Sequence, residues 1–135
     1  MIGELADVSD SYNVVAGVEA RGFILASAIA YATGKGLVPI RKSGKLPAAA
    51  YSESFALEYG EATLQIHQDA ILPGQRVLLI DDVLATGGTL IAAAALIERC
   101  GGIVDSTAVI MEIDGLGGGE NYSSRRAGSA VHVLL

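Results

Sequence analysis

The sequence predicts an α/β fold, a mostly parallel twisted sheet flanked by helices, with an antiparallel hairpin inserted between two of the strands. Two observations support this prediction. Short apolar runs rich in Val, Ile and Leu alternate with helix-compatible segments, and one central stretch alternates between polar and apolar residues. A length of 135 residues suits one folding unit and no repeat or linker divides it, so residues 1–135 are expected to form a single domain.

The elements follow from these runs and from the glycines that end them. Apolar residues, many of them β-branched, dominate the expected parallel strands, and a glycine follows each expected helix. In chain order we expect a strand at 13–18, a helix at 23–33, a strand at 37–40, a strand at 76–80, a helix at 89–100, a strand at 103–111, a loop at 115–119 and a strand at 130–135.

The inserted hairpin is predicted from a change of period. Residues 51–59 alternate between two sets, Gly60 interrupts them, and residues 63–67 alternate again. The first set is Tyr51, Glu53, Phe55, Leu57 and Tyr59, and the second is Ser52, Ser54, Ala56 and Glu58. Because this stretch lies between two expected parallel strands, we expect it to project from the sheet as a flap.

Composition narrows the classes of function. A formal charge of −6 disfavours general attraction to nucleic acid or to an anionic membrane surface. No apolar run approaches the roughly 20 residues that a membrane-spanning helix needs. With Cys100 as the sole cysteine no internal disulfide can form, which suits a reducing compartment, so a cytoplasmic protein is expected.

The most informative segment is 77–89, where an apolar strand leads into Asp81 and Asp82 and then into a glycine-threonine turn. The two carboxylates are open to three interpretations: metal ligands, acceptors for sugar hydroxyls, or the polar end of a strand. The turn at 85–89 opens a helix, so its backbone N–H groups suit a single phosphate. No lysine follows its glycines as in a triphosphate loop. The alternative is that Thr86 or Thr89 only caps the helix.

Cations follow the other two strands. Arg21 comes after the first strand and the basic segment 41–47 after the second. Right-handed crossovers place the ends of these strands and of 76–80 on one edge of the sheet. The sequence therefore predicts that the cations and the aspartates converge there, where a second, more highly charged phosphate group could bind.

Four segments in this order resemble the type I phosphoribosyltransferase family, and within it the members that use adenine. They are 77–89, 19–23 (EARGF), 41–47 (RKSGKLP) and 57–60 (LEYG), and the likeness extends over nearly the whole chain. The resemblance implies a Rossmann-like core with a mobile flap that closes over the site.

The resemblance also implies a role for each matching residue. Asp81 and Asp82 would contact the ribose hydroxyls, and Glu58 would exchange a proton with the purine; with Arg21 they are the expected catalytic residues. Tyr59 would close the flap. The expected phosphate-binding residues are Ala85, Thr86, Gly87, Gly88 and Thr89, and the expected pyrophosphate-binding residues are Arg21, Gly22, Lys42 and Lys45. Mg²⁺ would arrive bound to the donor rather than in a protein cage.

The implied reaction is a step of purine salvage in which phosphoribosyl pyrophosphate and adenine give AMP and pyrophosphate, catalysed by a homodimer. Family members carry several dozen further residues before the strand matching 13–18, including a hood that recognises the purine. Residues 1–135 are thus expected to be a core domain without that segment. The alternatives are a regulator that binds phosphoribosyl pyrophosphate without transferring it, an inactive truncated form, and a transferase for another base.

Overall fold

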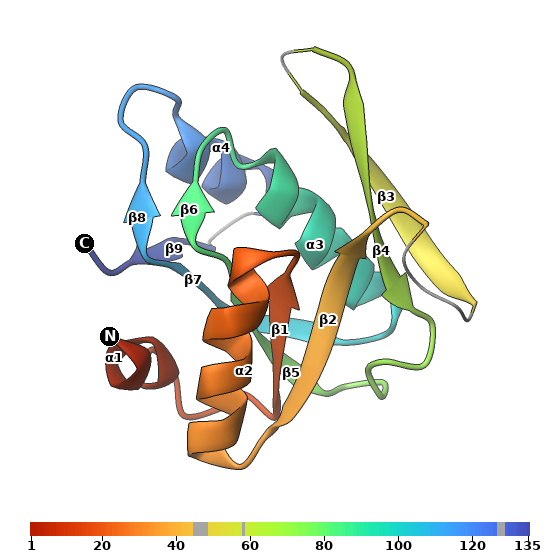
Figure 1. Cartoon of the computed structure of the whole chain (residues 1–135), viewed down its shortest axis with the longest axis vertical. Helices are drawn as coiled ribbons and strands as arrows, with labels where there is room; N and C mark the ends of the chain where they lie inside the picture. The colour runs from red at the N-terminus through yellow and green to blue at the C-terminus, as the bar shows by residue number, and fades with distance from the viewer. Residues whose placement is uncertain (45–48, 58, 127–128) are drawn as a thin grey trace.

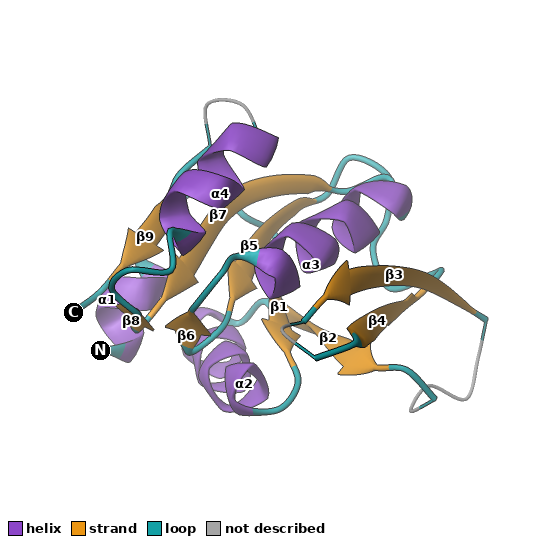
Figure 2. Cartoon of the chain, turned by 90° about the horizontal axis from the view of Figure 1, so that it is seen from above, coloured by secondary structure: helices purple, strands orange, loops and turns teal. Residues whose placement is uncertain are grey.

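The computed structural model describes residues 1–44, 49–57, 59–126 and 129–135, and it contains a seven-stranded sheet between two layers of helices (Figures 1 and 2). The sheet consists of β1 (Val14–Val18), β2 (Gly36–Lys42), β3 (Ala50–Ala56), β4 (Glu61–His67), β5 (Arg76–Ile80), β7 (Ile103–Val109) and β9 (Val131–Val133). A separate two-stranded sheet pairs β6 (Val83–Leu84) with β8 (Met111–Glu112). The helices are α1 (Ile2–Ala6), α2 (Arg21–Thr33), α3 (Gly88–Arg99) and α4 (Gly118–Arg125).

Five strands run parallel, in the spatial order β2-β1-β5-β7-β9. β1 is central and lies in register with both neighbours, so that Gly17 pairs with Pro39 of β2 and with Ile80 of β5. Every residue of β1 is buried, as expected for a strand covered on both faces. The predicted mostly parallel α/β fold is confirmed.

The two faces of the sheet form two apolar cores. Alternate residues of β1 point to opposite faces. Val14 and Val18 pack with α3 and the hairpin, whereas Val15 packs with α2 and α1. Figure 2 shows this layering, with α3 and α4 above the sheet and α1 and α2 below it.

The predicted hairpin is also confirmed. β3 and β4 pair antiparallel along their whole length, and β4 joins β2 antiparallel through Arg41 with Gln65 and Lys42 with Leu64. In Figure 1 the hairpin extends beyond the end of α3 at the upper right. Arg99 fixes it to α3, since its Nη1 donates to Ser52 O at 2.7 Å.

Several predicted boundaries are wrong. β2 continues through Arg41 and Lys42, which were expected in a loop, because β4 pairs with this extension. α2 begins at Arg21 rather than at residue 23. β3 ends at Ala56, so Tyr59 lies beyond the strand with 89% of its surface exposed. The expected alternation through residue 59 is therefore wrong at its end.

The sequence did not predict α4, β6 or β8. The segment expected as a loop at 115–119 leads into α4, and the strand expected at 103–111 ends at Val109, with residues 111–112 in β8. The predicted site residues Lys45 and Glu58 lie outside the described residues. In the part of the chain that the structure describes, no helix is long and apolar enough to cross a membrane.

Candidate active site at the carboxyl edge of the sheet

The order of the parallel strands creates a crevice at their carboxyl ends. After β1 the chain enters α2 on one face of the sheet, and after β5 it enters α3 on the other face. The loops that follow these adjacent strands therefore diverge, which is the usual position of ligand sites in open α/β sheets.

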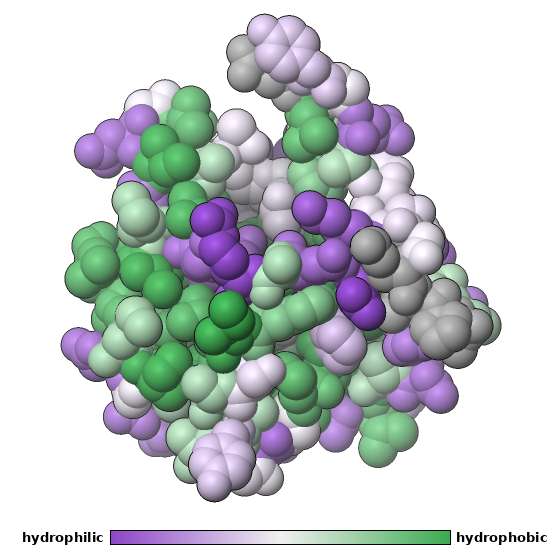
Figure 3. All heavy atoms as spheres, in the orientation of Figure 1, coloured by the Kyte–Doolittle hydropathy of each residue, from purple (hydrophilic) through white to green (hydrophobic). Residues whose placement is uncertain are grey.

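A cavity of about 440 Å³ occupies this position, and side chains from the ends of β1, β2 and β5 line it. Figure 3 shows hydrophilic side chains gathered near the middle of the face on which β1 and β2 end. The lining residues are Glu19, Ala20, Arg21, Lys42, Asp81, Asp82, Val83, Ala85 and Thr89. The predicted convergence of aspartates, cations and the start of the glycine-threonine turn is thus present.

Asp81 and Asp82 both reach this cavity because the chain has left the regular strand at Ile80. Asp81 N donates to Ala108 O of β7 at 3.2 Å, and Ile110 N, directly after β7, donates to Asp82 O at 2.9 Å. Asp82 N in turn donates to Asp81 Oδ1 at 2.9 Å. Backbone hydrogen bonds therefore fix the main chain of both residues, and one of them also holds the Asp81 carboxylate.

Asp81 is the more buried of the pair, with 8% of its surface exposed. Burial raises the pKa of its carboxyl to about 7, with further raising contributions from the side chain and charge of Asp82; the backbone N–H of Asp82 and the charge of Arg21 act in the opposite direction. Near pH 7 this carboxyl is poised between its neutral and charged forms.

Arg21 begins α2 and crosses the cavity to Asp82, with 2.6 Å between Nε and Oδ2. Its side chain is 77% exposed, so it can also face an anion that enters from solvent. Gly22 is different: it is buried, and a Cβ there would lie 3.0 Å from Ile80 O and 3.2 Å from Asp81 Oδ1. Gly22 allows α2 to approach β5 closely and does not line the cavity.

Glu19 connects the ends of β1 and β2. Its Oε1 accepts a hydrogen bond from Lys42 N at 2.9 Å and from Arg41 Nε at 3.4 Å. Lys42 thereby lies in the cavity beside Arg21, whereas the aromatic ring of Phe23 faces the Arg41 guanidinium at 5.7 Å. No role was predicted for Glu19, although an acidic residue opposite a basic segment is a signal for such a contact.

Residues 85–89, which are predicted to bind a phosphate and are called the phosphate loop below, turn sharply into α3. Gly87 has a φ of +93°, which favours glycine, and it is the N-cap of α3. No described side chain caps this helix, so the alternative in which Thr86 or Thr89 serves only as a cap is wrong. The backbone N–H groups at the start of α3, and the positive end of its helix dipole, therefore point into the space before the first turn of α3.

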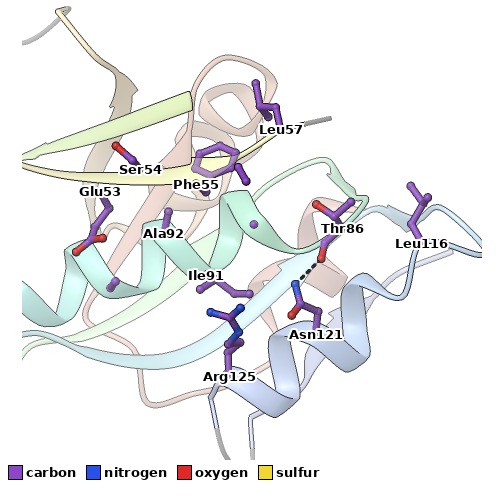
Figure 4. A pocket seen from close by; sticks show the side chains of 13 residues that line it. Glu53, Ser54, Phe55, Leu57, Thr86, Ile91, Ala92, Leu116, Asn121 and Arg125 are labelled. Carbon is purple, nitrogen blue, oxygen red and sulfur yellow. Dashed lines mark hydrogen bonds between the residues drawn. The ribbon is translucent and has the colours of Figure 1, made fainter. Parts of the chain in front are cut away.

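The phosphate loop separates the cavity from a second, larger groove. Ala85 and Thr89 line the cavity, whereas Thr86 and Gly88 line a groove of about 740 Å³ between β3, α3 and α4. The groove is mainly apolar, with Phe55 and Ile91 among its walls (Figure 4). We place the chemistry in the smaller cavity because the aspartates, Arg21 and Lys42 converge there.

One residue that the sequence analysis missed contacts the phosphate loop from α4. Asn121 Nδ2 donates to Thr86 O at 2.8 Å. Nothing in the local sequence marks Asn121, because this contact joins residues 35 positions apart.

Comparison with known proteins agrees with this geometry. Residues 3–122 match the phosphoribosyl transferase domain family. The adenine phosphoribosyltransferase of Salinispora arenicola is 59% identical over 126 residues, and the aligned part covers 93% of this chain and 65% of that protein. The chain thus spans about 65% of the length of this curated relative.

Solved structures give the same result. The adenine phosphoribosyltransferase of Rhodothermus marinus superposes with a TM-score of 0.91 at 44% identity, covering 99% of this chain and 76% of that one. The Trypanosoma brucei enzyme, solved with AMP, pyrophosphate and ribose-5-phosphate, superposes with a TM-score of 0.85 at 27% identity, covering 98% of this chain and 63% of that one. The chain belongs to the phosphoribosyltransferase family, and the relatives that it matches within this family are adenine phosphoribosyltransferases.

Proposed function

We propose that this chain transfers a phosphoribosyl group from phosphoribosyl pyrophosphate to adenine, giving AMP and pyrophosphate, as a step of purine salvage. The observation that carries this proposal is the shared cavity in which an aspartate pair, two cations and the phosphate loop meet. The Trypanosoma brucei enzyme was solved with AMP, pyrophosphate and ribose-5-phosphate. AMP and pyrophosphate are the two products of this reaction, and ribose-5-phosphate is a part of the donor.

Each part of the cavity suits one part of the donor. The helix start at Gly88 and the Thr89 hydroxyl suit the 5′-phosphate. Asp81 and Asp82 are placed to accept hydrogen bonds from ribose hydroxyls, and a charged Asp82 would stabilise positive charge that develops on the sugar. Arg21 and Lys42 would stabilise the departing pyrophosphate.

A pyrophosphate that binds the exposed guanidinium of Arg21 would also draw it from Asp82. Arg21 Nε contacts Asp82 at 2.6 Å, so an anion that recruits Arg21 releases Asp82 toward the sugar. This movement of Arg21 would supply its guanidinium to the pyrophosphate and the Asp82 carboxylate to the ribose of the donor. Glu58 and Lys45 are further candidates from the sequence, for proton exchange with the purine and for pyrophosphate binding.

Magnesium fits this cavity as a partner of the donor. Over the ranges 1–44, 49–57, 59–126 and 129–135, no group of three or more His, Cys, Asp or Glu side chains could hold a metal ion. Asp81 and Asp82 are nevertheless hard oxygen donors beside the proposed pyrophosphate position. A bound Mg²⁺ would neutralise charge on the leaving group.

The test is conversion of labelled adenine to AMP with phosphoribosyl pyrophosphate and Mg²⁺. We expect the chain to form AMP, and we expect Asp82→Asn to lower kcat/KM by about a hundredfold, in the range for loss of one transition-state electrostatic contact. Asp114→Asn is the matched control, since Asp114 is exposed and does not line the cavity. It should leave kcat/KM unchanged.

Calorimetric titration separates this proposal from its alternatives. Binding of the donor without any AMP formation would identify a donor-binding regulator or an inactive form. Binding of neither the donor nor AMP would contradict the proposal.

We also propose that the chain forms a homodimer through the outer face of α2. This face exposes Ile24 (71%) and Tyr31 (92%), two turns apart on the same side of the helix. After Arg21 the helix contains no charged residue. An exposed, uncharged helix face of this kind is typical of an interface.

A further inference from the structure

The geometry points to Asn121 as a positioning residue that holds the phosphate loop in the shape that binds phosphate. This inference rests on the proposed function, because it assumes that residues 85–89 receive the 5′-phosphate of the donor or of AMP. Asn121 lies on α4 and does not line the cavity that holds the aspartates.

Figure 4 shows the hydrogen bond between Asn121 and Thr86. Asn121 reaches from α4 to the phosphate loop, and its Nδ2 donates to Thr86 O at 2.8 Å. In a trans peptide the carbonyl and the next N–H point in opposite directions. When Asn121 holds the Thr86 carbonyl on the α4 side, the N–H of Gly87 therefore points away from α4.

This orientation matters because the loop separates two spaces. Asn121 and Thr86 line the larger groove, whereas Ala85 and Thr89 line the cavity with the aspartates. A carbonyl turned toward the groove keeps its negative end away from an anion in the cavity, and presents N–H groups in its place. Without Asn121 the Thr86–Gly87 peptide could rotate and direct its carbonyl at the phosphate.

Asn121 is itself well anchored. The next residue, Tyr122, is fully buried, and its hydroxyl shares a hydrogen bond of 2.7 Å with Thr107 Oγ1 of β7. At the end of α4, Arg126 Nη1 lies 2.6 Å from Glu98 Oε1 of α3. Because α4 is held to β7 and to α3, the amide of Asn121 acts as a preorganised support for the loop.

A positioning role differs from a purely stabilising one. The Asn121–Thr86 hydrogen bond is exposed to solvent, so water replaces it in its absence and folding loses little. Phosphate binding, in contrast, depends on the direction of the loop N–H groups. Loss of one such oriented hydrogen bond is expected to weaken binding about fivefold.

The experiment uses two variants that remove the side-chain N–H group of Asn121 in different ways. Asn121→Leu keeps the branched shape, and Asn121→Ala introduces the residue with the highest helix propensity, which preserves α4. Ser124→Ala is the matched control on the same helix, because the Ser124 hydroxyl contacts the Asn121 backbone and not the loop. AMP binding is measured by calorimetry, KM by steady-state kinetics and Tm by circular dichroism.

We expect both variants at position 121 to raise the Kd for AMP and the KM for phosphoribosyl pyrophosphate about fivefold. The KM for adenine and the Tm should not change, and Ser124→Ala should leave all four quantities unchanged. Unchanged AMP affinity in a folded variant would overturn the inference and leave the proposed function intact. A parallel rise of both KM values with a lower Tm would also overturn it, since that pattern indicates general loss of structure. If the unaltered chain binds neither AMP nor the donor, both proposals fail together.

Discussion

At the scale of single residues, the adjacent carboxylates Asp81 and Asp82 have different surroundings. Asp81 is 8% exposed and its pKa is raised to about 7, first by burial, whereas the Asp82 side chain is 18% exposed and pairs with Arg21. A neutral Asp81 can donate a hydrogen bond as well as accept one. The pair therefore combines a carboxylate that contacts Arg21 with one that can change its protonation state near pH 7.

The raised pKa of Asp81 predicts a pH-dependent cost to stability. Below about pH 4 the folded and unfolded chains both carry the proton. Between about pH 4 and pH 7 the unfolded chain releases it while the folded chain keeps it, so the free energy of unfolding falls as pH rises. Asp81→Asn removes this cost, so we expect it to stabilise the protein at pH 8 by about 2–4 kcal/mol. Urea unfolding at pH 4 should show almost no difference.

Asp105 offers a control of opposite sign. Burial opposes its ionisation, but hydrogen bonds from Ser9, Arg76 and Ser106 outweigh burial and lower its pKa. Asp105→Asn should therefore destabilise the protein at pH 8, where Asp81→Asn stabilises it. An equal stability difference for Asp81→Asn at pH 4 and pH 8 would show that its carboxyl is not the source of the effect.

At the scale of secondary-structure elements, α4 is joined to the phosphate loop by close packing as well as by Asn121. A Cβ added to Gly118 would overlap the Ala85 carbonyl oxygen and lie 2.9 Å from Leu84 Cδ1. A Cβ at the next residue, Gly119, would meet only the flexible end of Glu112, at 3.3 Å. The two glycines therefore form a matched pair within one helix.

This pair supplies a prediction. Gly118→Ala should lower the free energy of unfolding by about 1–3 kcal/mol through overpacking, and it should weaken AMP binding because the phosphate loop is displaced. Gly119→Ala should keep AMP affinity and raise stability by up to about 1 kcal/mol, since alanine favours helix over glycine. Chemical denaturation and calorimetry measure both effects. Equal behaviour of the two variants would rule out the close contact with the loop.

The elements differ in how far the sequence predicts them. The buried strand β5 was predicted with its observed bounds, and β1 to within one residue, because uniformly apolar runs suit only the sheet centre. α4 gave no such signal: its sequence is GGENYSSR and Tyr122 is its one fully buried large side chain among the described residues. Tertiary contacts with β7 and α3 stabilise it. β6 and β8, of two residues each, are too short to produce a pattern.

The same distinction applies to the site. Asp81, Asp82, Arg21 and Lys42 were predicted to converge, because each follows or ends a parallel strand and such ends share one edge. Asn121 acts through a contact across 35 positions, which depends on the packed structure and leaves no local pattern. The contact of Glu19 with Lys42 spans 23 positions, and its one signal is an acidic residue opposite a basic segment.

At the scale of the whole molecule, the distribution of exposed apolar residues bears on assembly. α2 covers one face of the sheet and begins at Arg21, so a partner on its outer face would lie close to the cavity. Ile24 is 71% exposed on this face, and no charged residue follows Arg21 in the helix. Burial of such a side chain in a dimer would contribute roughly 1.5–3 kcal/mol per protomer.

We therefore predict that Ile24→Glu shifts the protein from dimer to monomer, because a charge at the centre of an apolar contact is left without water or a partner. Sedimentation velocity at several protein concentrations measures the shift. Leu72→Glu is the matched control: Leu72 is similarly exposed, at 65%, but precedes β5 at the opposite edge of the sheet. It should leave the dimer intact. A dimer that survives Ile24→Glu would place the interface elsewhere, and a monomeric unaltered chain would contradict the proposed assembly.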